Sequence, residues 1–568
     1  MSEGVTPKRR RWRRRVVLLG LAVVAVWLFL RDWGPRVPER AFLLIDLRDA
    51  LVETEADGLE AILEAPHVDL LSLREGLGAA ADDPRILAAV VRVGPGALGF
   101  AMAEDVAALL DQFRKSGKPV VAYAESPDGP GYAAICGADE ILCESGGEIS
   151  LVGVSIDALL VADALRKLGV EFDLVRVGEF KGVFEQLVSS APSPEFTSAL
   201  DDLAHSLQAS LIRGIARRRA QTESQVSAAI DEAPLGGPQA IALRLVDAVG
   251  YSDELAARVA ARVKATAEPI TLEDYVSSRR AAVVGERVAV VHIVGIIADR
   301  AASPIPGLGE VSGADDVADA LRLAREDSGI KGVLLRIDSP GGTVTGSEKI
   351  WRAIALTRKV KPVVVSMGSV AASGGYFAAC AADRIVAQPS TLTGSIGVVG
   401  GKVILEKLLE DRAVHRVEAS SGRRAGMFDP FSRFTEDERA AMTRRIEESY
   451  RLFLERVTAG RKKTLEEVDR LARGRVWTGA EALDRGLVDA LGGVDDALRV
   501  LRDLARLGPE SRLVLERFPG KRSPLEIITR RRTPSPLASS LDEASALALV
   551  GAVSGRPLAL DLWCLCVR

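Results

Sequence analysis

Histidine is scarce in this chain of 568 residues, which contains only four: His67, His205, His292 and His415. None of them lies in a glycine-rich turn or beside an aspartate motif, so the sequence argues against a Ser-His-Asp triad. The five cysteines are too few for a disulfide scaffold. Cys564 and Cys566 lie close together, but they have no histidine nearby and make a weak metal site. We therefore expect neither a metal nor an organic cofactor.

Long apolar runs are also scarce, and the clearest one lies near the N-terminus. Residues 16–30 are apolar, but at 1.5 Å per residue they span only about 22 Å of a roughly 30 Å hydrocarbon core. Seven of the eight residues at positions 8–15 are basic, and tryptophans at both edges of the run suit a membrane interface.

Two interpretations of this segment are open, a cleaved signal peptide and an uncleaved anchor. Residues 31–35 offer no small-x-small cleavage site, which favours the anchor. We therefore expect residues 1–34 to form a cytoplasmic basic segment and a single membrane-spanning helix. The basic side stays in the cytoplasm, so the catalytic part of this single-pass protein would lie on the extracytoplasmic side of the cytoplasmic membrane.

Neither sign of charge is in large excess, since the net charge is −4. The chain is 48% hydrophobic and 27% charged, which allows substantial cores in more than one domain. The positive charge near the N-terminus is interpreted as part of a membrane-targeting signal. We therefore expect no nucleic-acid partner.

The richest chemistry lies in residues 361–400. Their pattern predicts a buried strand at 363–367, a helix from about Ser373, a short strand at 384–387 and then a Gly/Ser/Thr loop. A serine between a strand and a helix can point its hydroxyl into a cleft, while the helix N-terminus offers N–H groups to an anion. The alternative is a tight turn in which Ser373 caps the helix.

A second glycine-rich turn lies some thirty residues upstream. There a predicted strand runs into Asp338-Ser339-Pro340-Gly341-Gly342 and is followed by a helix. Two such turns on neighbouring strands can aim backbone N–H groups at one point. That is the arrangement of an oxyanion hole beside a nucleophile.

Three motifs together resemble signal peptide peptidase of the SppA type, a family of membrane-bound Ser/Lys proteases with the ClpP/crotonase fold. They are Ser-Pro-Gly-Gly at 339–342, Ala-Ser-Gly-Gly-Tyr at 372–376 and Leu-Thr-Gly-Ser-Ile-Gly at 392–397. The resemblance implies that Ser373 is the nucleophile and that Ser395 orients a lysine base. It also implies oxyanion donors at Gly342 and Gly374, cleaved signal peptides as substrates, and a homotetramer.

The chain also contains an internal repeat. Residues 131–139, GYAAICGAD, match residues 375–383, GYFAACAAD, at an offset of 244. Each copy opens with a hydrophobic strand and then alternates strands with helices, which predicts α/β units with largely parallel sheets. With the resemblance, this predicts tandem ClpP/crotonase-like repeats at 41–263 and 287–507, a connector at 264–286 and a C-terminal tail at 508–568.

The two copies differ where the chemistry is expected. At the offset of 244, Ser373 corresponds to Gly129 and Gly374 corresponds to Pro130. The first copy therefore lacks both the hydroxyl and an amide donor, and it cannot be a second complete serine site.

The serine needs a base to take its proton. A lysine can serve if its ammonium is desolvated enough to be neutral near pH 7. The candidate is Lys181, which follows a predicted strand at 172–177, whereas the second copy has Ala425 at the equivalent position. Its alternative is an exposed loop lysine. The resemblance favours the base, so base and nucleophile would come from different copies.

The expected function is that of a membrane-anchored serine endopeptidase that degrades remnant signal peptides and other membrane-associated peptides. Two other functions stay open. A crotonase-like acyl-CoA enzyme would also use glycine-turn amides, but it predicts a CoA phosphate site and a catalytic glutamate, and neither is evident. A non-catalytic membrane scaffold would keep the fold without the chemistry.

Overall fold

The computed structural model describes residues 35–54, 68–279, 284–300, 310–509, 511–519 and 558–560. The expected anchor at residues 1–34 lies outside these ranges, as do Cys564 and Cys566. Among the described residues, no helix combines the length and the apolar character needed to cross a bilayer.

The first repeat is built on a six-stranded parallel sheet with the order β8-β4-β3-β2-β1-β9. Its strands are β1 (Ala41–Leu47), β2 (Ile86–Val93), β3 (Val120–Ala124), β4 (Glu140–Glu144), β8 (Ala248–Gly250) and β9 (Glu268–Thr271). Helices cover it: α3 (Leu70–Asp82), α4 (Phe100–Arg114), α5 (Gly129–Ile135), α9 (Glu223–Glu232), α10 (Gly237–Ala242), α11 (Leu255–Val263) and α12 (Leu272–Ser278). Apolar residues fill β2 almost continuously because both of its faces are covered. β9 and α12 lie in the expected connector and pack on this repeat.

The second repeat has an eight-stranded sheet with the main order β19-β17-β15-β13-β10-β21. Its strands are β10 (Glu286–Val294), β13 (Ile330–Ser339), β15 (Val363–Ala372), β16 (Arg384–Ala387), β17 (Leu392–Gly394), β19 (Val476–Thr478), β20 (Ala490–Leu491) and β21 (Leu513–Phe518). Its helices include α13 (Ala314–Glu326), α14 (Val344–Thr357), α15 (Gly374–Ala379), α19 (Gly479–Asp484) and α20 (Val494–Leu504). β16 and β20 extend the sheet beside β15.

Equivalent side chains make the same contacts in the two repeats. Tyr132 donates to the carbonyl of Leu245 at 2.7 Å, and Tyr376 donates to the carbonyl of Leu487 at 2.8 Å. All four residues are buried, and both tyrosines lie in the segments that the sequence shows as duplicated. The predicted internal repeat is therefore confirmed.

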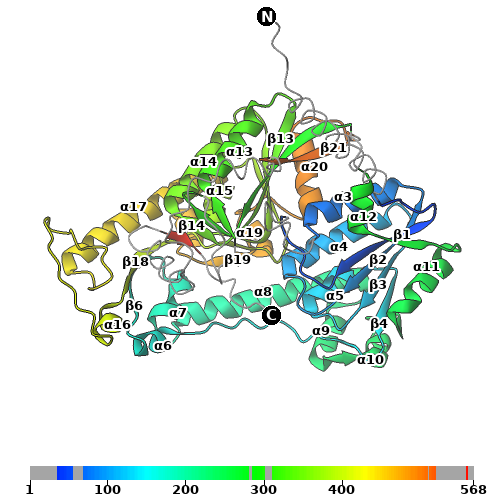
Figure 1. Cartoon of the computed structure of the whole chain (residues 1–568), viewed down its shortest axis with the longest axis horizontal. Coiled ribbons are helices and arrows are strands. Elements are labelled where there is room, and N and C mark those ends of the chain that lie inside the picture. Colours follow the sequence, from blue (N-terminus) through cyan, green and yellow to red (C-terminus); the bar gives the residue numbers. More distant parts are fainter. Residues whose placement is uncertain are drawn as a thin grey trace, which may run out of the picture.

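The two repeats share one hydrophobic core. Val288, Leu334 and Val364 from one face of the second sheet join the same buried cluster as Leu73 and Met102 from α3 and α4 of the first repeat. Figure 1 shows these two helices between the sheets. Because apolar burial extends across the boundary, the repeats hold one another in a fixed orientation.

A third sheet combines strands from both repeats, in the order β12-β11-β14-β22-β18-β6. Its strands are β6 (Glu171–Val177), β11 (Ile296–Ala298), β12 (Val311–Gly313), β14 (Gly341–Thr343), β18 (Val398–Ile404) and β22 (Leu558–Leu560). β6 comes from the first repeat and pairs antiparallel with β18 along its whole length. This pairing carries first-repeat residues into the second repeat.

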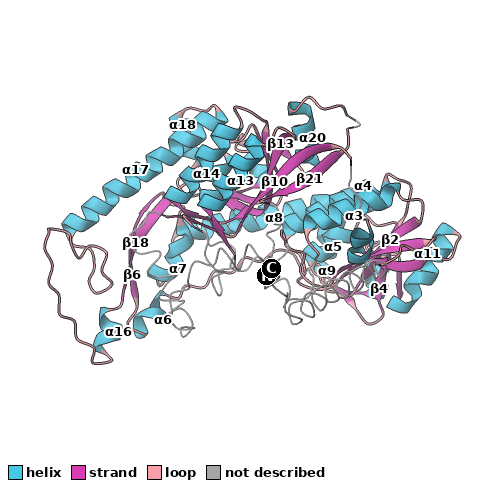
Figure 2. Ribbon diagram, turned by 45° about the horizontal axis from the view of Figure 1, so that its top comes forward, coloured by secondary structure: helices cyan, strands magenta, loops and turns pink. Residues whose placement is uncertain are grey.

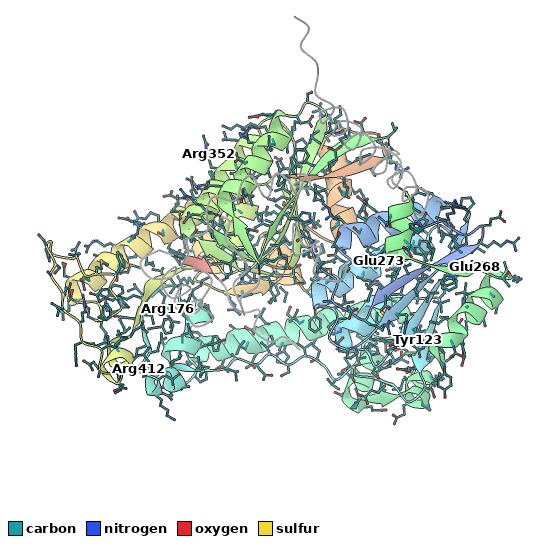
Figure 3. All side chains as sticks on the ribbon, viewed as in Figure 1. Tyr123, Arg176, Glu268, Glu273, Arg352 and Arg412 are labelled. Atoms are coloured by element: carbon teal, nitrogen blue, oxygen red, sulfur yellow. The ribbon has the colours of Figure 1, made fainter. Side chains whose placement is uncertain are left out.

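The chain reaches β6 and returns through α6 (Ala162–Lys167), α7 (Glu185–Val188) and the long α8 (Pro194–Arg219). Figures 1 and 2 both show β6 and β18 at the end of the molecule away from β2 and β4, beside α17 (Glu436–Arg461). Figure 3 shows the same separation through Arg176 on β6 and Tyr123 on β3. The remaining helices α16 (Glu406–Glu410) and α18 (Leu465–Leu471) belong to the second repeat.

Candidate active site

Ser373 lies between β15 and α15, as the sequence predicted. Its backbone has φ 53° and ψ −113°. Residues other than glycine rarely adopt this conformation, which costs on the order of 1–3 kcal/mol. Its N–H donates to the carbonyl of Gly394 at 2.8 Å, and its carbonyl accepts from Phe377 at 2.8 Å. Ser373 holds the N-cap position of α15, but its side chain makes no capping bond to the helix, so the hydroxyl does not serve as a cap.

Lys181 approaches Ser373 from the first repeat. It follows β6, and its side chain is 1% exposed, so the alternative of an exposed loop lysine is also wrong. Its nitrogen Nζ lies within hydrogen-bond distance of Ser373 Oγ, at 2.7 Å. The structure therefore brings together two buried side chains that lie 192 residues apart in the sequence.

Ser395 completes the cluster around the lysine. Lys181 Nζ donates to Ser395 Oγ at 2.7 Å and to the Ser395 carbonyl at 3.0 Å. Ser395 is fully buried, and its N–H is fixed by the carbonyl of Arg475 at 2.8 Å. Three bonds from one amine fix both its position and the direction in which it faces Ser373.

The β6–β18 pairing explains how this meeting is achieved. Val177, the last residue of β6, lies opposite Val398, the first residue of β18. In an antiparallel pair, the chain leaving β6 and the chain entering β18 run side by side. Lys181 lies four residues after Val177 and Ser395 three residues before Val398, so the register places both at the same end of the pair.

A third segment packs against both residues and was not identified from the sequence. The carbonyl of Arg473 accepts from Phe180 at 3.0 Å, and Gly474 donates to the carbonyl of Ile396 at 2.8 Å. A Cβ at Gly474, where φ is +82°, would lie 2.5 Å from the backbone nitrogen of Lys181. Only glycine permits this approach, so Gly474 forms part of the wall that positions the amine.

The two predicted glycine-rich turns lie side by side. A Cβ at Gly375 would lie 2.9 Å from the carbonyl oxygen of Ser339, which shows how closely the start of α15 packs on the Ser-Pro-Gly-Gly turn. A Cβ at Gly342 would lie 1.9 Å from the carbonyl oxygen of Ile297, so this position also requires glycine. The expected oxyanion donors Gly342 and Gly374 thus belong to two turns in direct contact.

The short strand β22 lies between β14 and β18. Ala559 lies opposite Gly342, and Leu558 lies opposite both Thr343 and Val399. Both pairings are antiparallel and both involve backbone atoms. The space beside the Gly342 turn therefore accepts an extended chain that is paired on both of its edges.

The counterpart site of the first repeat has different chemistry. At Gly129, the equivalent of Ser373, α5 begins with Gly129 and Pro130, and the side chain of Asp128 caps it through the N–H of Gly131 at 2.8 Å. The turn is therefore an ordinary capped helix start with no hydroxyl at this position.

No cysteine or histidine within the described ranges belongs to the cluster around Ser373. Burial raises the pKa of the Cys136 and Cys380 thiols to about 12, as expected for core residues. Burial also lowers the pKa of His292 to about 4. Across the ranges that the structure describes, no group of three or more His, Cys, Asp or Glu side chains is arranged to hold a metal ion.

The chain is similar to known families of proteases. The family model of peptidase family S49 matches residues 112–266 and again residues 355–508, and the Clp protease model matches residues 306–392. A chloroplastic serine protease SPPA of Arabidopsis thaliana is 28% identical over 497 residues, which cover 86% of this chain and 72% of that protein.

Two bacterial relatives are both called Protease 4. The Salmonella typhi protein is 34% identical over 412 residues, which cover 70% of this chain and 66% of the relative. The Haemophilus influenzae protein is 31% identical over 450 residues, which cover 75% of this chain and 71% of the relative.

Proposed function

This chain belongs to peptidase family S49 and is a serine protease with two repeats of an α/β ClpP-like fold, and from that membership we propose that Ser373 and Lys181 form its catalytic dyad. The observation that carries the proposal is the 2.7 Å bond between Lys181 Nζ and Ser373 Oγ inside the protein. An acyl-CoA enzyme is not favoured, because the matching families are peptidases.

In the proposed reaction, Ser373 Oγ attacks the carbonyl carbon of the scissile peptide bond, and Lys181 Nζ takes the hydroxyl proton. In this role the amine of Lys181 has to be neutral before it takes the proton. Ser395 holds Nζ in place through the 2.7 Å bond. A positioned base of this kind contributes about 10²- to 10⁴-fold to the rate.

In the same proposal, the N–H groups of Gly342 and Gly374 stabilise the negative charge that develops on the carbonyl oxygen. Loss of one such donor costs about 10²- to 10³-fold in kcat. Protonated Lys181 then gives its proton to the leaving amine. A water molecule, deprotonated by the same lysine, hydrolyses the ester on Ser373 and restores the free hydroxyl.

The substrate is proposed to be an extended peptide that lies between β14 and β18. The pairing of β22 with both strands supports this, because it shows that the position accepts a chain in the β conformation. Main-chain pairing of this kind recognises a peptide with little regard to its sequence. That suits remnant signal peptides and other apolar, membrane-associated peptides, which the sequence motifs suggested.

The cellular setting is part of the same proposal. A single anchor within residues 16–30 would hold the protease in the cytoplasmic membrane with its catalytic part on the extracytoplasmic side. The proposed assembly is a homotetramer, which sedimentation of the detergent-solubilised full chain would test.

The proposed function is tested by incubating the full-length protein in detergent with a synthetic Leu/Ala-rich signal peptide and following the fragments by mass spectrometry. The wild-type chain should cut the peptide, and Ser373→Ala should not. Ser210→Ala serves as a control, because Ser210 is a buried serine on α8 rather than on β15. Undiminished cleavage by Ser373→Ala would contradict the proposal. A wild-type chain that does not cut the peptide would contradict it as well and would favour a non-catalytic scaffold.

A further inference from the structure

The strand that ends at Ser373 contains an irregularity. β13 and β15 pair in register up to Ile337 opposite Met367, and the next pair is Ser339 opposite Ala371. One residue of β13, Asp338, thus faces three residues of β15, so β15 carries two extra residues. This is a β-bulge, a feature that re-aims strands next to active sites.

The bulge changes the partner of β15. Before it, residues 364–366 pair with β16, and after it residues 370–372 pair with β17. β17 ends at Gly394, whose carbonyl accepts from the N–H of Ser373 at 2.8 Å, and Ser395 follows directly. The bulge therefore brings the nucleophile beside the serine that holds the lysine.

Side chains satisfy the backbone groups that the bulge releases from the sheet. The Asp338 carboxyl group accepts from the N–H of Val370 at 2.8 Å. On the carbonyl side, Thr391 Oγ1 donates to Gly368 at 2.8 Å. Buried backbone groups without a partner are costly, so these bonds decide whether the bulge persists.

Two carboxylates of the first repeat bind Arg336, a buried arginine of β13 that contacts β15 just before the bulge. Arg336, which is 1% exposed, donates to the carbonyl of Met367 at 3.0 Å, just before the bulge. Its guanidinium is bound by Glu53 at 2.7 Å and 2.8 Å and by Asp105 at 2.8 Å. The first repeat thus fixes the second repeat at the strand that carries the nucleophile.

In the first repeat the equivalent strand pair ends where the bulge of the second repeat begins. β2 and β3 stay in register from Ala89 opposite Val120 to Val93 opposite Ala124. At the offset of 244, Arg336 has the counterpart Arg92, but Asp338 has the counterpart Gly94. The repeat that lacks the nucleophile therefore lacks both the carboxylate and the continuation of the strand beyond this point.

We propose that Asp338 is a positioning residue, whose carboxylate holds the bulge of β15 and thereby places Ser373 against Lys181. This inference rests on the proposed role of Ser373 and extends it to a group that touches neither the substrate nor the reacting atoms. Without the carboxyl group, the N–H of Val370 loses its acceptor and the end of β15 relaxes.

The test compares Asp338→Ala and Asp338→Asn in the full-length protein. Active sites are titrated with a fluorophosphonate, and kcat and KM for a fluorogenic peptide are expressed per titrated site. A misplacement of about 1 Å costs about 100-fold, so Asp338→Ala should lose about 100-fold in kcat with KM within about 3-fold of wild type. Asparagine is isosteric and keeps one acceptor oxygen, so its loss should be smaller, about 10-fold.

Asp383 supplies the matched control. Its carboxylate accepts from the N–H of Val363 at 2.9 Å, at the other end of the same strand. Asp383→Ala should lower the melting temperature while kcat per titrated site stays within about 3-fold of wild type, because β15 separates it from Ser373 by roughly 30 Å.

Three results would overturn the inference: wild-type kcat per site in Asp338→Ala, an effect on KM alone, or an equal loss of kcat in Asp383→Ala. If Asp338→Ala does not fold, the isosteric Asp338→Asn decides, and a wild-type kcat in that variant counts against the inference. Ser373→Ala separates this outcome from a failure of the proposed function. Full activity in Ser373→Ala would remove the function itself, whereas an inactive Ser373→Ala with an unaffected Asp338 series would remove only the role of Asp338.

Discussion

Replacing Gly474 with alanine should misplace Lys181 without removing any functional group of the proposed site. A Cβ at position 474 would lie 2.5 Å, 2.6 Å and 2.6 Å from the N, Cα and Cβ atoms of Lys181, whereas ordinary contact begins at 3.4 Å. Backbone atoms cannot rotate away as a long side chain can. The two segments must therefore separate by about 1 Å, which predicts a loss of about 100-fold in kcat.

The same substitution has a second cost that must be measured separately. Gly474 has φ +82°, and a residue with a Cβ costs about 1–2 kcal/mol in this region. Gly146 has φ +85° with nothing within 4 Å of a Cβ built there, so Gly146→Ala carries the conformational cost without the clash.

The assay measures kcat for a fluorogenic peptide, per site titrated with a fluorophosphonate, together with the melting temperature. Both variants should lose stability, and only Gly474→Ala should lose kcat. If kcat in Gly474→Ala stays within about 3-fold of Gly146→Ala, the close contact with Lys181 does not position the amine and the reasoning is refuted.

Three further predictions follow from the site and its surroundings. Ser395→Ala removes one of the two oxygens that Ser395 offers to Lys181 Nζ, so kcat should fall by about 10-fold with KM unchanged, and an unaltered kcat would contradict its orienting role. Burial raises the pKa of Glu104 to about 7, so the folded chain keeps a proton above pH 4.5 that the unfolded chain releases, and this group's contribution to stability falls as the pH rises through 7. Glu104→Gln should therefore be more stable than wild type at pH 8 by on the order of 2 kcal/mol and lose that advantage near pH 5, as thermal unfolding at both pH values would show or disprove. A chain that ends at residue 557 lacks β22 and frees the edges of β14 and β18, so KM for an extended peptide should fall; an unchanged KM would mean that peptides bind elsewhere.

The position of Ser373 could be predicted because its signal is local: an apolar strand, a serine and two glycines read in order. The strand itself was predicted to end near residue 367, but β15 continues to Ala372. The small residues Gly368 and Ser369 have the composition of a turn. Asp338, Thr391 and the change of partner from β16 to β17 hold this stretch within the strand, and none of the three leaves a mark on local periodicity.

Lys181 illustrates a different limit. Its neighbourhood in the sequence fits an exposed loop as well as a buried base, and the choice depended on the comparison of the two repeats and on the family resemblance. Its burial depends on the β6–β18 register, which is a long-range pairing. Gly474 had no signal at all, because Arg473-Gly474-Arg475 follows a helix and has the composition of an ordinary helix end.

The electrostatic side of the fold was also beyond the sequence. Arg336 lies in an apolar strand and is 1% exposed, and its partners Glu53 and Asp105 come from the other repeat. A buried charge is stable only when it is paired. A single sequence does not show which distant carboxylates provide that pairing.

The most direct test of the dyad is the rate constant for acylation of Ser373 by a fluorophosphonate in Lys181→Met. Lys402→Met is the matched control, since Lys402 is also 1% exposed but lies on β18 over the ring of Phe434 at 4.8 Å. If Lys181 takes the proton of Ser373, Lys181→Met should slow acylation by about 100-fold or more while Lys402→Met reacts at the wild-type rate. Equal acylation rates in the two variants would contradict the account.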